Sequence, residues 1–577
     1  MFFAAWCRPD QKHTVEVMAL LRRDGAVQLA TENAVLAAWS PACLVREGPR
    51  ANAFAASDRA GACLPGHPNA RLDREKLLVT AGPLPQYPVY YAVTEGGGRL
   101  IASSQLGPLA SLFPSASIDA RRLAMLIAYG TETDTDRTVY AGILRLRPCE
   151  TIVAERDGLR ITRDFPRLAG AYRKGNPQDL AVELRDRLEG AVARATSGAD
   201  RIAVLVSGGL DSSGVLALAS AVCREVPGKT LDAISVQYAG PGDDRPYFTE
   251  LTTALGLAPI RLRPQDAAPW FGQSLCMDAQ PGNLASTCLF LLQGAKAVER
   301  EADVVLTGVS GDKISGGLFP FAGFTQLARR GRLLSAVNGA LRLRLPWQMD
   351  PLLRARYVLS PLIPEAVRRV KRRFVGKPER PAWLTARSRE LVEHAQTDDD
   401  LDARELPCSP DESMRHLCTQ GQIADVADAL GQMATVTQCF PVDVFLDEDF
   451  VRFVLELDPI LLSHGHEFRG LYRLAMRGLL PERLLRRQDK GAFEPAIAAA
   501  SASAVDVLRD LSSLDELANR GLVNPRPLRP MLDACLGMMR RGEREKELPQ
   551  DEHLQEVWQL LSAEAFLREC GRGRGLS

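Results

Sequence analysis

Short runs of alternating apolar and polar residues dominate the first 165 residues of the chain. KLLVTAG, YPVYYAVTE and ETIVAERDGLRITRDF have the alternation that is typical of β-strands, and Asp157-Gly158 in the last run tolerates the positive φ of a hairpin turn. We therefore expect residues 1–165 to form a domain that is mostly β-sheet. Residues 166–178 are rich in Pro, Gly and charged side chains, and they predict a linker.

A different pattern begins at residue 179. DLAVELRDRLEGAVARA has helical periodicity, and the short apolar runs RIAVLV, AISVQY, PIRLRP and VVLTG predict strands that alternate with helices. This alternation is typical of a parallel sheet with helices on both faces. We predict an α/β fold with a doubly wound parallel sheet over residues 179–565 and helical additions beyond residue 320.

Composition and charge exclude several classes of protein. Lys+Arg and Asp+Glu each number 71, so the formal net charge is +0 and no nucleic-acid or membrane partner is expected. The 12 cysteines form no C-x-x-C pair, which predicts buried thiols in a reducing, cytoplasmic setting rather than a zinc site or a disulfide scaffold. No apolar run approaches the roughly 20 residues of a membrane helix. The basic run 368–377 is interpreted as a solvated helix face, with an anionic partner as the alternative.

The stretch SGGLDSS, residues 207–213, lies between a buried strand and a helix that we expect to begin near Ser213. Ligands of parallel sheets bind beyond the carboxyl ends of the strands. Gly208 and Gly209 let the backbone approach a ligand, and the N–H groups at the helix start form an anion site. Asp211 is unexpected there unless a cation such as Mg²⁺ binds as well. The stretch predicts a site for a nucleotide polyphosphate and its metal; a purely structural turn is the alternative.

This stretch resembles the S-G-G-x-D-S motif of the ATP pyrophosphatases, the PP-loop enzymes that cleave ATP between its α and β phosphates to adenylate a substrate. VVLTGVSGDKISGG, residues 304–317, follows another strand and resembles a loop of the asparagine synthetase superfamily. Its matching positions are Thr307, Gly308, Asp312, Gly316 and Gly317.

Three further segments extend the resemblance. DDRPY at residues 243–247 resembles the acidic loop of the superfamily, VFLDEDFVRFVLELD resembles its P-F-L-D segment, and GLYRLAMRGLLPERLLRRQDKGAF resembles its closing block. The motifs occur in chain order over about residues 180–500.

The resemblance implies roles for individual residues. The implied ATP-binding residues are Ser207, Gly208, Gly209, Leu210, Asp211, Ser212, Ser213 and Gly308. Asp211 and Asp312, at the ends of neighbouring strands, would share a Mg²⁺ ion that bridges the phosphates. Lys490 falls on the lysine of the closing block, which contacts the phosphates and stabilises charge that develops during acyl transfer. Asp211, Asp312 and Lys490 are therefore the candidate catalytic residues.

Residues 1–165 resemble the Ntn-type glutamine amidotransferase domain, a β-sandwich that precedes the synthetase domain in asparagine synthetases. That domain works through a cysteine directly after the initiator Met, with its own α-amine as the base. Phe2 occupies this position here, and Cys7 is better interpreted as a packed thiol. We expect a degenerate domain without glutaminase activity.

The resemblance is strongest to one branch of the superfamily. Val309 stands where asparagine synthetases have Glu and β-lactam synthetases have Tyr. Lasso-peptide cyclases tolerate this loop and lack the N-terminal cysteine, which implies a macrolactam synthetase. Such an enzyme adenylates an Asp or Glu side chain of a precursor peptide, and the peptide's N-terminal amine closes the ring. Holding both groups in one pocket contributes about 7–11 kcal/mol.

A leader-binding protein and a leader peptidase are the implied partners, and the helical segment 320–420 is expected to wall a peptide pocket. Three alternatives remain open. The first is an asparagine synthetase or a β-lactam synthetase. The second is a PP-loop enzyme that acts on transfer RNA, which the neutral charge disfavours. The third is a non-catalytic scaffold, which the retention of Asp211, Asp312 and Lys490 disfavours.

Overall fold

The chain was studied as a computed structural model. It describes residues 2–7, 27–30, 34–38, 44–46, 53–57, 69–73, 76–94, 99–113, 116–129, 136–155, 157–238, 243–282, 285–316, 321–345, 348–363, 381–399, 407–419, 421–488, 494–541 and 551–571.

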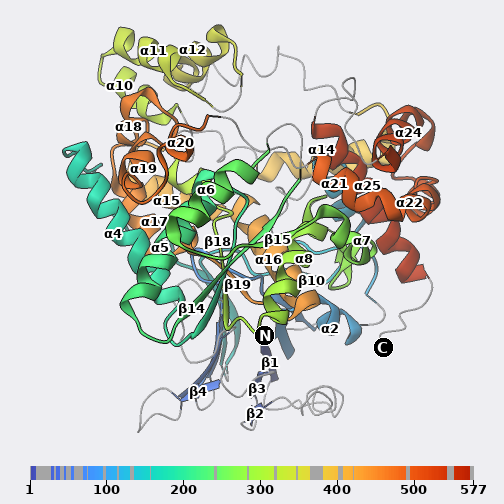
Figure 1. Ribbon diagram of the computed structural model, residues 1–577. Helices are drawn as coiled ribbons and strands as arrows, with labels where there is room; N and C mark the ends of the chain where they lie inside the picture. The colour runs from blue at the N-terminus through green and yellow to red at the C-terminus, as the bar shows by residue number, and fades with distance from the viewer. Residues whose placement is uncertain are drawn as a thin grey trace.

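Two six-stranded antiparallel sheets form the N-terminal part, at the bottom of Figure 1. The first sheet has the order β10-β8-β9-β1-β3-β2, with bounds β1 (Phe2–Cys7), β2 (Val27–Ala30), β3 (Ala34–Ala38), β8 (Tyr90–Val93), β9 (Arg99–Ser103) and β10 (Ile143–Arg145). The second has the order β12-β11-β7-β6-β5-β4, with bounds β4 (Leu44–Arg46), β5 (Ala53–Ser57), β6 (Asn69–Asp73), β7 (Lys76–Thr80), β11 (Glu150–Glu155) and β12 (Gly158–Arg163). Helices α2 (Leu106–Ser111) and α3 (Ala120–Tyr129) complete this part.

The two sheets pack face to face. Buried and half-buried residues alternate along β7, so that Leu77 and Val79 point into a core shared with Leu100 and Ala102 of the other sheet. This arrangement confirms the predicted β-sandwich. The hairpin predicted at Asp157-Gly158 is also confirmed, because Glu155 pairs with Gly158 across β11 and β12.

A five-stranded parallel sheet forms the centre of the rest of the chain. Its order is β15-β14-β13-β18-β19, with bounds β13 (Arg201–Leu205), β14 (Thr230–Val236), β15 (Ile260–Leu262), β18 (Val304–Thr307) and β19 (Pro441–Asp443). The sequence patterns predicted the first four strands and missed β19. A three-residue strand carries too few positions to show alternation.

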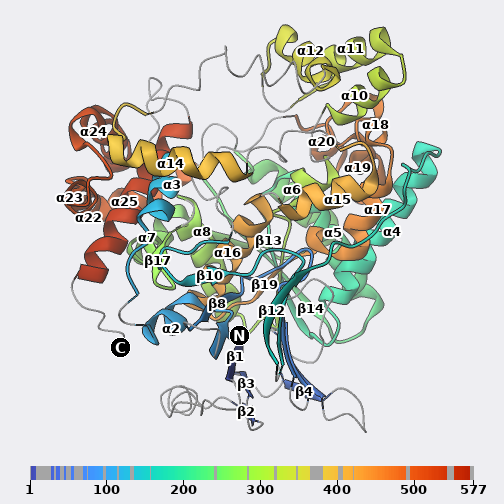
Figure 2. The same ribbon diagram turned by 180° about the vertical axis from the view of Figure 1, so that it is seen from behind.

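Helices cover both faces of this sheet. Ile202 and Val204 of β13 point into a core with α4 (Pro177–Ala195) and α5 (Leu210–Glu225), whereas Ala203 and Leu205 point into a core with α7 (Ala268–Leu275), α8 (Thr287–Glu299) and α25 (Asp551–Gly571). Figures 1 and 2 show α4 on one side of the sheet and α7 and α25 on the other. The predicted doubly wound sheet is confirmed, since side chains alternate between two apolar cores.

Helices dominate the described residues beyond 320, as predicted. The remaining helices are α6 (Arg245–Leu255), α9 (Gly311–Ser315), α10 (Ala322–Arg329), α11 (Leu333–Arg342), α12 (Pro351–Leu359), α14 (Ala386–Asp399), α15 (Pro410–Thr419), α16 (Gly421–Thr437), α17 (Glu448–Glu456), α18 (Pro459–Leu462), α19 (Gly470–Ala475), α20 (Glu482–Leu485), α21 (Glu494–Ser501), α22 (Val505–Leu511), α23 (Asp515–Asn519) and α24 (Pro525–Arg541). None of the helices in the described part of the chain combines the length and the apolar character that crossing a lipid bilayer requires.

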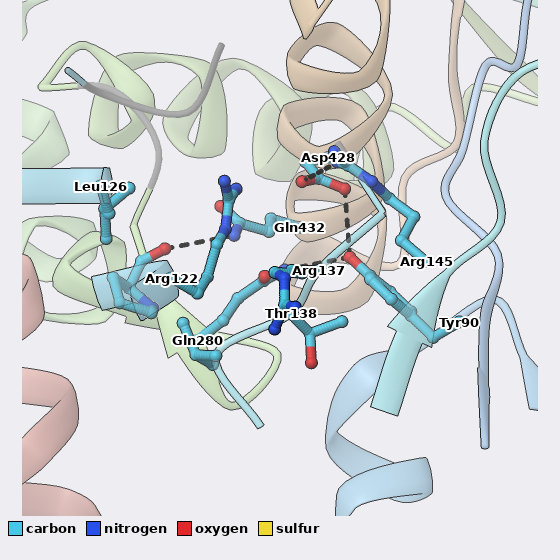
Figure 3. Close-up of a pocket in the computed structure, with 11 residues that line it drawn as sticks. Tyr90, Arg122, Leu126, Arg137, Thr138, Arg145, Gln280, Asp428 and Gln432 are labelled. Carbon is cyan, nitrogen blue, oxygen red and sulfur yellow. Dashed lines mark hydrogen bonds and ion pairs between the residues drawn. The ribbon is translucent and has the colours of Figure 1, made fainter. Parts of the chain in front are cut away.

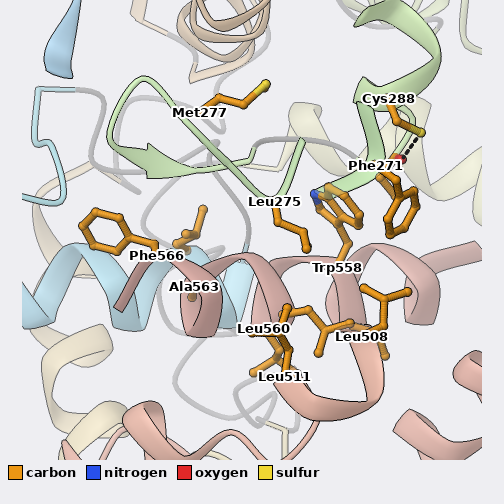
Figure 4. Close-up of a cluster of buried hydrophobic side chains, with 14 of the residues drawn as sticks. Phe271, Leu275, Met277, Cys288, Leu508, Leu511, Trp558, Leu560, Ala563 and Phe566 are labelled. Atoms are coloured by element: carbon orange, nitrogen blue, oxygen red, sulfur yellow. Dashed lines mark hydrogen bonds between the residues drawn. The ribbon is translucent and has the colours of Figure 1, made fainter. Parts of the chain in front are cut away.

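Trp558 of α25 anchors the C-terminal helices to the domain. Its side chain is fully buried, and its ring meets Phe271 edge to face at 5.5 Å between centroids (Figure 4). Its indole N–H donates a hydrogen bond to the carbonyl oxygen of Gly282 at 3.2 Å. The indole therefore contributes apolar burial without leaving its N–H group unsatisfied.

A buried polar cluster joins the β-sandwich to the domain built on the parallel sheet (Figure 3). Asp428 of α16 accepts hydrogen bonds from Tyr90 at 3.2 Å and from Arg145 at 2.5 Å, and Gln280 donates to the Tyr90 hydroxyl at 3.1 Å. The side chains of Arg145 and Asp428 are only 4% and 9% exposed. Burial raises the pKa of Tyr90, and the charge of Asp428 raises it further. A charged pair held in this way fixes the two domains to each other.

Candidate functional site

The candidate site lies where the strand order of the parallel sheet reverses. The chain proceeds from β13 outward to β15 on one side and then returns to β18 on the other side of β13. The loops that follow β13 and β18 therefore leave the sheet in opposite directions and open a crevice between them. A cavity of about 310 Å³ occupies this place, lined by both loops.

The first loop turns sharply between β13 and α5. The Ser207 N–H donates to Ser212 Oγ and the Gly209 N–H donates to Ser207 Oγ, both at 3.2 Å. Gly208 has a φ of +87°, and a Cβ there would lie 2.8 Å from the Cβ of Asp244. Glycine is therefore required for the turn and for the close approach of the neighbouring loop.

The helix after this loop begins at Leu210 and not near Ser213. The sequence prediction placed its start too late because the first helical turn is polar. Hydrophobic periodicity becomes visible only from Val215 onward, whereas Asp211 and Ser212 already lie in the helix with side chains toward the cavity wall. The amide groups of this first turn are the ones that an anion would meet.

The structure places most of the predicted ATP-binding residues together. Six of the eight line the cavity, namely Ser207, Gly209, Leu210, Asp211, Ser212 and Gly308. The other two contribute differently: Gly208 shapes the turn, and Ser213 is fully buried.

The second loop packs directly against the first. A Cβ on Gly308 would lie 3.1 Å from the Ser212 nitrogen, and a Cβ on Gly311 would lie 2.5 Å from both Cβ and Cγ of Asp211. This contact brings Asp312, in the first turn of α9, to the cavity that Asp211 also lines. The two aspartates that the sequence singled out thus share one cavity, although each lies in a helical turn that follows a strand.

Asp443, at the end of β19, holds the second loop and was missed by the sequence analysis. It is fully buried, and it accepts hydrogen bonds from the Ser310 N–H at 2.7 Å and from the Phe445 N–H at 3.2 Å. Burial raises its pKa to about 6, and the charge of Asp211 adds to this, whereas the hydrogen bonds from Ser310 and Phe445 oppose it. The only sequence signal was an aspartate after the short apolar run FPV.

The β-sandwich contacts the same position. The Gln86 amide donates to the Asp443 carbonyl oxygen and accepts from the Asp443 N–H, both at 2.9 Å. Gln86 thereby satisfies both backbone groups of an edge strand. The N-terminal domain therefore supports the residue that positions the Asp312 loop.

Two arginines form ion pairs in the cavity and were not singled out by the sequence analysis: Arg469, directly before the closing block, and Arg487, within it. Arg469 pairs with Asp211, and the two side chains are 12% and 16% exposed. Arg487 pairs with Asp244 at 2.5 Å and donates to the Gly208 carbonyl oxygen at 3.1 Å. Burial lowers the pKa of Arg469, but the Asp211 carboxylate more than offsets this and the pKa is raised.

A third arginine, Arg473, also lines the cavity. It donates hydrogen bonds to the carbonyl oxygens of Phe468, Leu485 and Arg487 at 3.2, 2.5 and 2.8 Å. Burial lowers its pKa, and the charge of Arg469 lowers it further. Arg473 and Arg487 lie within the closing block, whereas Arg469 lies one residue before it, and the resemblance assigned a role in this block to its lysine alone.

Part of the cavity lining is apolar. It is formed by Val206, Val236, Leu289 and Phe290, with Tyr238 beside them. An apolar wall next to helix-start amides and arginines fits a molecule with a flat ring and an anionic tail, which is the chemistry of a nucleotide.

The residues present also fit a Mg²⁺ ion. Asp211 and Asp312 supply carboxylate oxygens, and the buried Thr307 hydroxyl in the same cavity has no hydrogen-bond partner among the described residues. No group of three or more His, Cys, Asp or Glu side chains among the described residues forms a complete metal cage. Mg²⁺ ordinarily binds through one or two carboxylates and completes its shell with phosphate oxygens and water.

Some predicted positions lie outside the described residues. These are Lys490, Gly317 and the basic run 368–377. Residues 2–7, which include Phe2 and Cys7, form strand β1 between β3 and β9.

Comparison with known proteins gives a clear family match. The family model described as asparagine synthase matches residues 183–568. The curated protein asparagine synthetase [glutamine-hydrolyzing] 3 of Bacillus subtilis (strain 168) is 21% identical over 433 residues, which cover 72% of this chain and 64% of that protein. The chain therefore spans less than two thirds of the length of this relative.

Two solved structures are also similar over part of the chain. The NH3-dependent NAD synthetase of Campylobacter jejuni is 15% identical and covers 43% of this chain and 94% of its own, with a TM-score of 0.19. The U34-tRNA thiolase of Methanococcus maripaludis is 14% identical and covers 44% and 87%, with a TM-score of 0.20. At these scores the likeness carries no weight, and the fold assignment rests on the sheet order described above.

Proposed function

The chain belongs to the asparagine synthase family, and from this premise we propose that it is an ATP-dependent ligase that joins a carboxyl group to an amine and releases AMP and pyrophosphate. One observation carries the proposal. The two loops that the motifs predicted meet in a single cavity, which is lined by Asp211, Asp312 and several apolar side chains. A cavity with this lining suits ATP with its metal ion, which is the substrate that the motifs imply.

In the proposed complex the adenine ring lies against the apolar wall, and the phosphates face the first turn of α5. The N–H groups and the positive end of this 16-residue helix favour the anion. Arg469, Arg473 and Arg487 add positive charge in a partly desolvated site. Asp211 and Asp312 would hold Mg²⁺, which when bound neutralises phosphate charge and polarises the phosphorus–oxygen bonds.

The reaction proceeds in two transfers. A substrate carboxylate oxygen attacks the α-phosphorus, the bond to the β-phosphate oxygen breaks, and pyrophosphate leaves. The amine nitrogen then attacks the acyl carbon, the bond to the AMP oxygen breaks, and the nitrogen loses a proton. The chain's contribution is to hold the phosphates and the acyl group in one orientation, with Lys490 proposed to stabilise the charge that develops.

For the substrate, we propose the Asp or Glu side chain of a peptide, attacked by the N-terminal amine of the same peptide to close a macrolactam. Val309 supports this choice. It lines the cavity with its side chain 39% exposed and presents neither a carboxylate nor a hydroxyl. A small, polar amino-acid substrate needs such a partner in its site, whereas a reactive group delivered by a longer peptide is held by contacts elsewhere.

The surface of α11 and α12 supports a peptide substrate as well. Seven of the thirteen exposed large hydrophobic side chains of the described residues lie on these two helices: Leu333, Leu334, Leu341, Leu352, Leu353, Tyr357 and Leu359. Exposed Arg332, Arg342 and Arg356 accompany them and form no ion pair with any described residue. Exposed apolar side chains concentrated in this way, beside exposed arginines, suit an acidic polypeptide with apolar side chains.

This surface is joined to the cavity through the backbone. The Arg344 N–H donates to the His466 carbonyl oxygen at 2.9 Å, and the Phe468 N–H donates to the Arg344 carbonyl oxygen at 3.1 Å. Phe468 itself lines the cavity. A peptide that lay along α11 and α12 would thus rest on the segment that carries the site. A leader-binding protein and a leader peptidase, in the cytoplasm, are the partners that this function requires.

A second candidate is an amide synthetase for small substrates, either an asparagine synthetase or a β-lactam synthetase. The family match and the name of the Bacillus subtilis relative favour the first of these.

The two candidates make different products. Purified full-length protein is incubated with ATP, Mg²⁺ and either Asp- or Glu-containing precursor peptides or free aspartate with ammonia. The peptide function predicts a product lighter by one water, with AMP and pyrophosphate in equal amounts and no glutamate from glutamine. Formation of asparagine alone would favour the second candidate. Absence of ATP-dependent product in every reaction, with D211N equal to wild type, would refute the ligase.

A further inference from the structure

We propose that Arg469 and Mg²⁺ compete for Asp211. Before the metal–nucleotide complex binds, Arg469 forms an ion pair with Asp211; when the complex binds, Mg²⁺ takes the carboxylate and Arg469 forms hydrogen bonds with the phosphates instead. The inference rests on the proposed function, because it takes ATP as the ligand of the cavity. It gives Arg469 the role of holding the Asp211 carboxylate in place until Mg²⁺ arrives, a role that does not follow from the family match or from the predicted metal site.

The contact itself is close and shielded from water. Arg469 Nη1 donates to Asp211 Oδ2, and little of either side chain is exposed. The charge of Asp312 also acts on Arg469 and adds to the rise of its pKa, and both residues line the same cavity. The guanidinium occupies part of the acceptor capacity of Asp211 Oδ2 and places a positive charge beside the carboxylate, so it disfavours a second cation on the same group.

Of the three arginines that line the cavity, Arg469 is the one able to change partners. Arg487 is held by Asp244 and by the Gly208 carbonyl oxygen, and Arg473 is held by three backbone carbonyls. Among the described residues, the hydrogen bond of Arg469 goes to Asp211, and its Nε has no partner. Its remaining N–H groups can therefore meet phosphate oxygens, for which guanidinium has a strong geometric preference.

The backbone around Arg469 is shaped to present this side chain. Arg469 precedes α19 with a φ of +59°, a left-handed conformation that few non-glycine residues adopt. The next residue, Gly470, lies so close to His464 that a Cβ would collide with its carbonyl oxygen. The guanidinium lies over the Phe468 ring, 5.2 Å from its centroid, and this contact helps to hold it. Strained backbone of this kind is concentrated at functional sites.

The test measures metal binding without turnover. Mn²⁺, which takes the oxygen ligands that Mg²⁺ takes, is titrated into full-length protein and free Mn²⁺ is followed by electron paramagnetic resonance. In the absence of nucleotide, R469M should bind Mn²⁺ about ten-fold more tightly than wild type, because a charge-assisted hydrogen bond no longer competes for Asp211. With Mg²⁺ present, the affinity of R469M for ATP should fall about ten-fold, because a phosphate partner is lost.

Two controls separate this role from a structural one. R473M removes an arginine that lines the same cavity but donates its hydrogen bonds to backbone carbonyls, and its nucleotide-free Mn²⁺ affinity should rise much less than that of R469M. The double variant R469M/D211N should not show the increased Mn²⁺ affinity that is expected of R469M. If R469M does not fold, R469Q supplies the same neutral change and should shift Mn²⁺ affinity in the same direction.

The outcomes distinguish this inference from the proposed function. Unchanged Mn²⁺ affinity in a folded R469M or R469Q, with wild-type protein still binding Mg²⁺–ATP, would overturn the competition and leave the ligase standing. If wild-type protein binds no ATP, the proposed function fails, whatever the Mn²⁺ titration gives.

Discussion

Replacing Gly311 by alanine tests whether the contact between the two loops positions Asp211. A Cβ on Gly311 would lie 2.5 Å from both Cβ and Cγ of Asp211. Non-bonded carbon atoms are normally about 3.5–4.0 Å apart, so the aspartate has to move by about 1 Å. The clash displaces the candidate metal ligand itself. We therefore expect G311A to reduce activity much more than it reduces the stability of the fold.

The two effects of G311A can be estimated separately. Overpacking costs about 1–3 kcal/mol, and alanine in a helix gains about 1 kcal/mol over glycine, so the net loss of stability is about 0–2 kcal/mol. A displacement of about 1 Å at a reacting group lowers the rate about 100-fold. We therefore expect pyrophosphate release to fall about 100-fold, with a clear loss of Mg²⁺–ATP affinity in calorimetry and only a small change in thermal unfolding.

Gly272 provides the matched control for this variant. It also lies in a short helix, α7, and a Cβ there would meet no atom within 4 Å. G272A should retain wild-type activity and unfold at the same or a slightly higher temperature. Wild-type ATP affinity and turnover in G311A would refute the reasoning. The position of the Asp211 carboxylate would then not depend on the absence of a side chain at residue 311.

Two further predictions concern buried carboxylates. The pKa of Asp443 is about 6 in the folded state, against an ordinary value of 3.8 for an aspartate. Its contribution to the stability of the fold is therefore full below pH 4 and is lost as the pH rises through 6, a loss of about 3 kcal/mol. D443N removes this titration. The free energy of unfolding of D443N, measured in urea and compared with that of wild type, should therefore increase from pH 4 to pH 7. If the two proteins show the same dependence of stability on pH, the raised pKa of Asp443 is contradicted. D428A leaves Arg145 buried without its carboxylate and should cost about 3–5 kcal/mol, with earlier proteolysis between the domains. The double variant R145M/D428M should recover most of this loss, and a D428A protein as stable as wild type would show that the pair does not hold the interface.

The sequence by itself determined the features that depend on neighbouring residues. Alternation along KLLVT predicted a strand with one buried face, and the run of strand, glycines and helix around Asp211 predicted a turn that faces a ligand. Because the carboxyl ends of parallel strands meet at one edge of a sheet, the sequence also brought Asp211 and Asp312 to the same place. The start of α5 was misplaced since its polar first turn faces the cavity and does not contribute to the apolar pattern.

Only the tertiary structure decided which distant side chains complete the site. Arg469 is 258 positions from Asp211, Asp443 is 133 from Ser310, and Gln86 is 357 from Asp443. Arg469 acquires its role through a left-handed residue at the start of a short helix, and Asp443 through a three-residue strand. Neither feature has a period that a sequence pattern can show, and their positions follow from how the two apolar cores pack on opposite faces of the sheet.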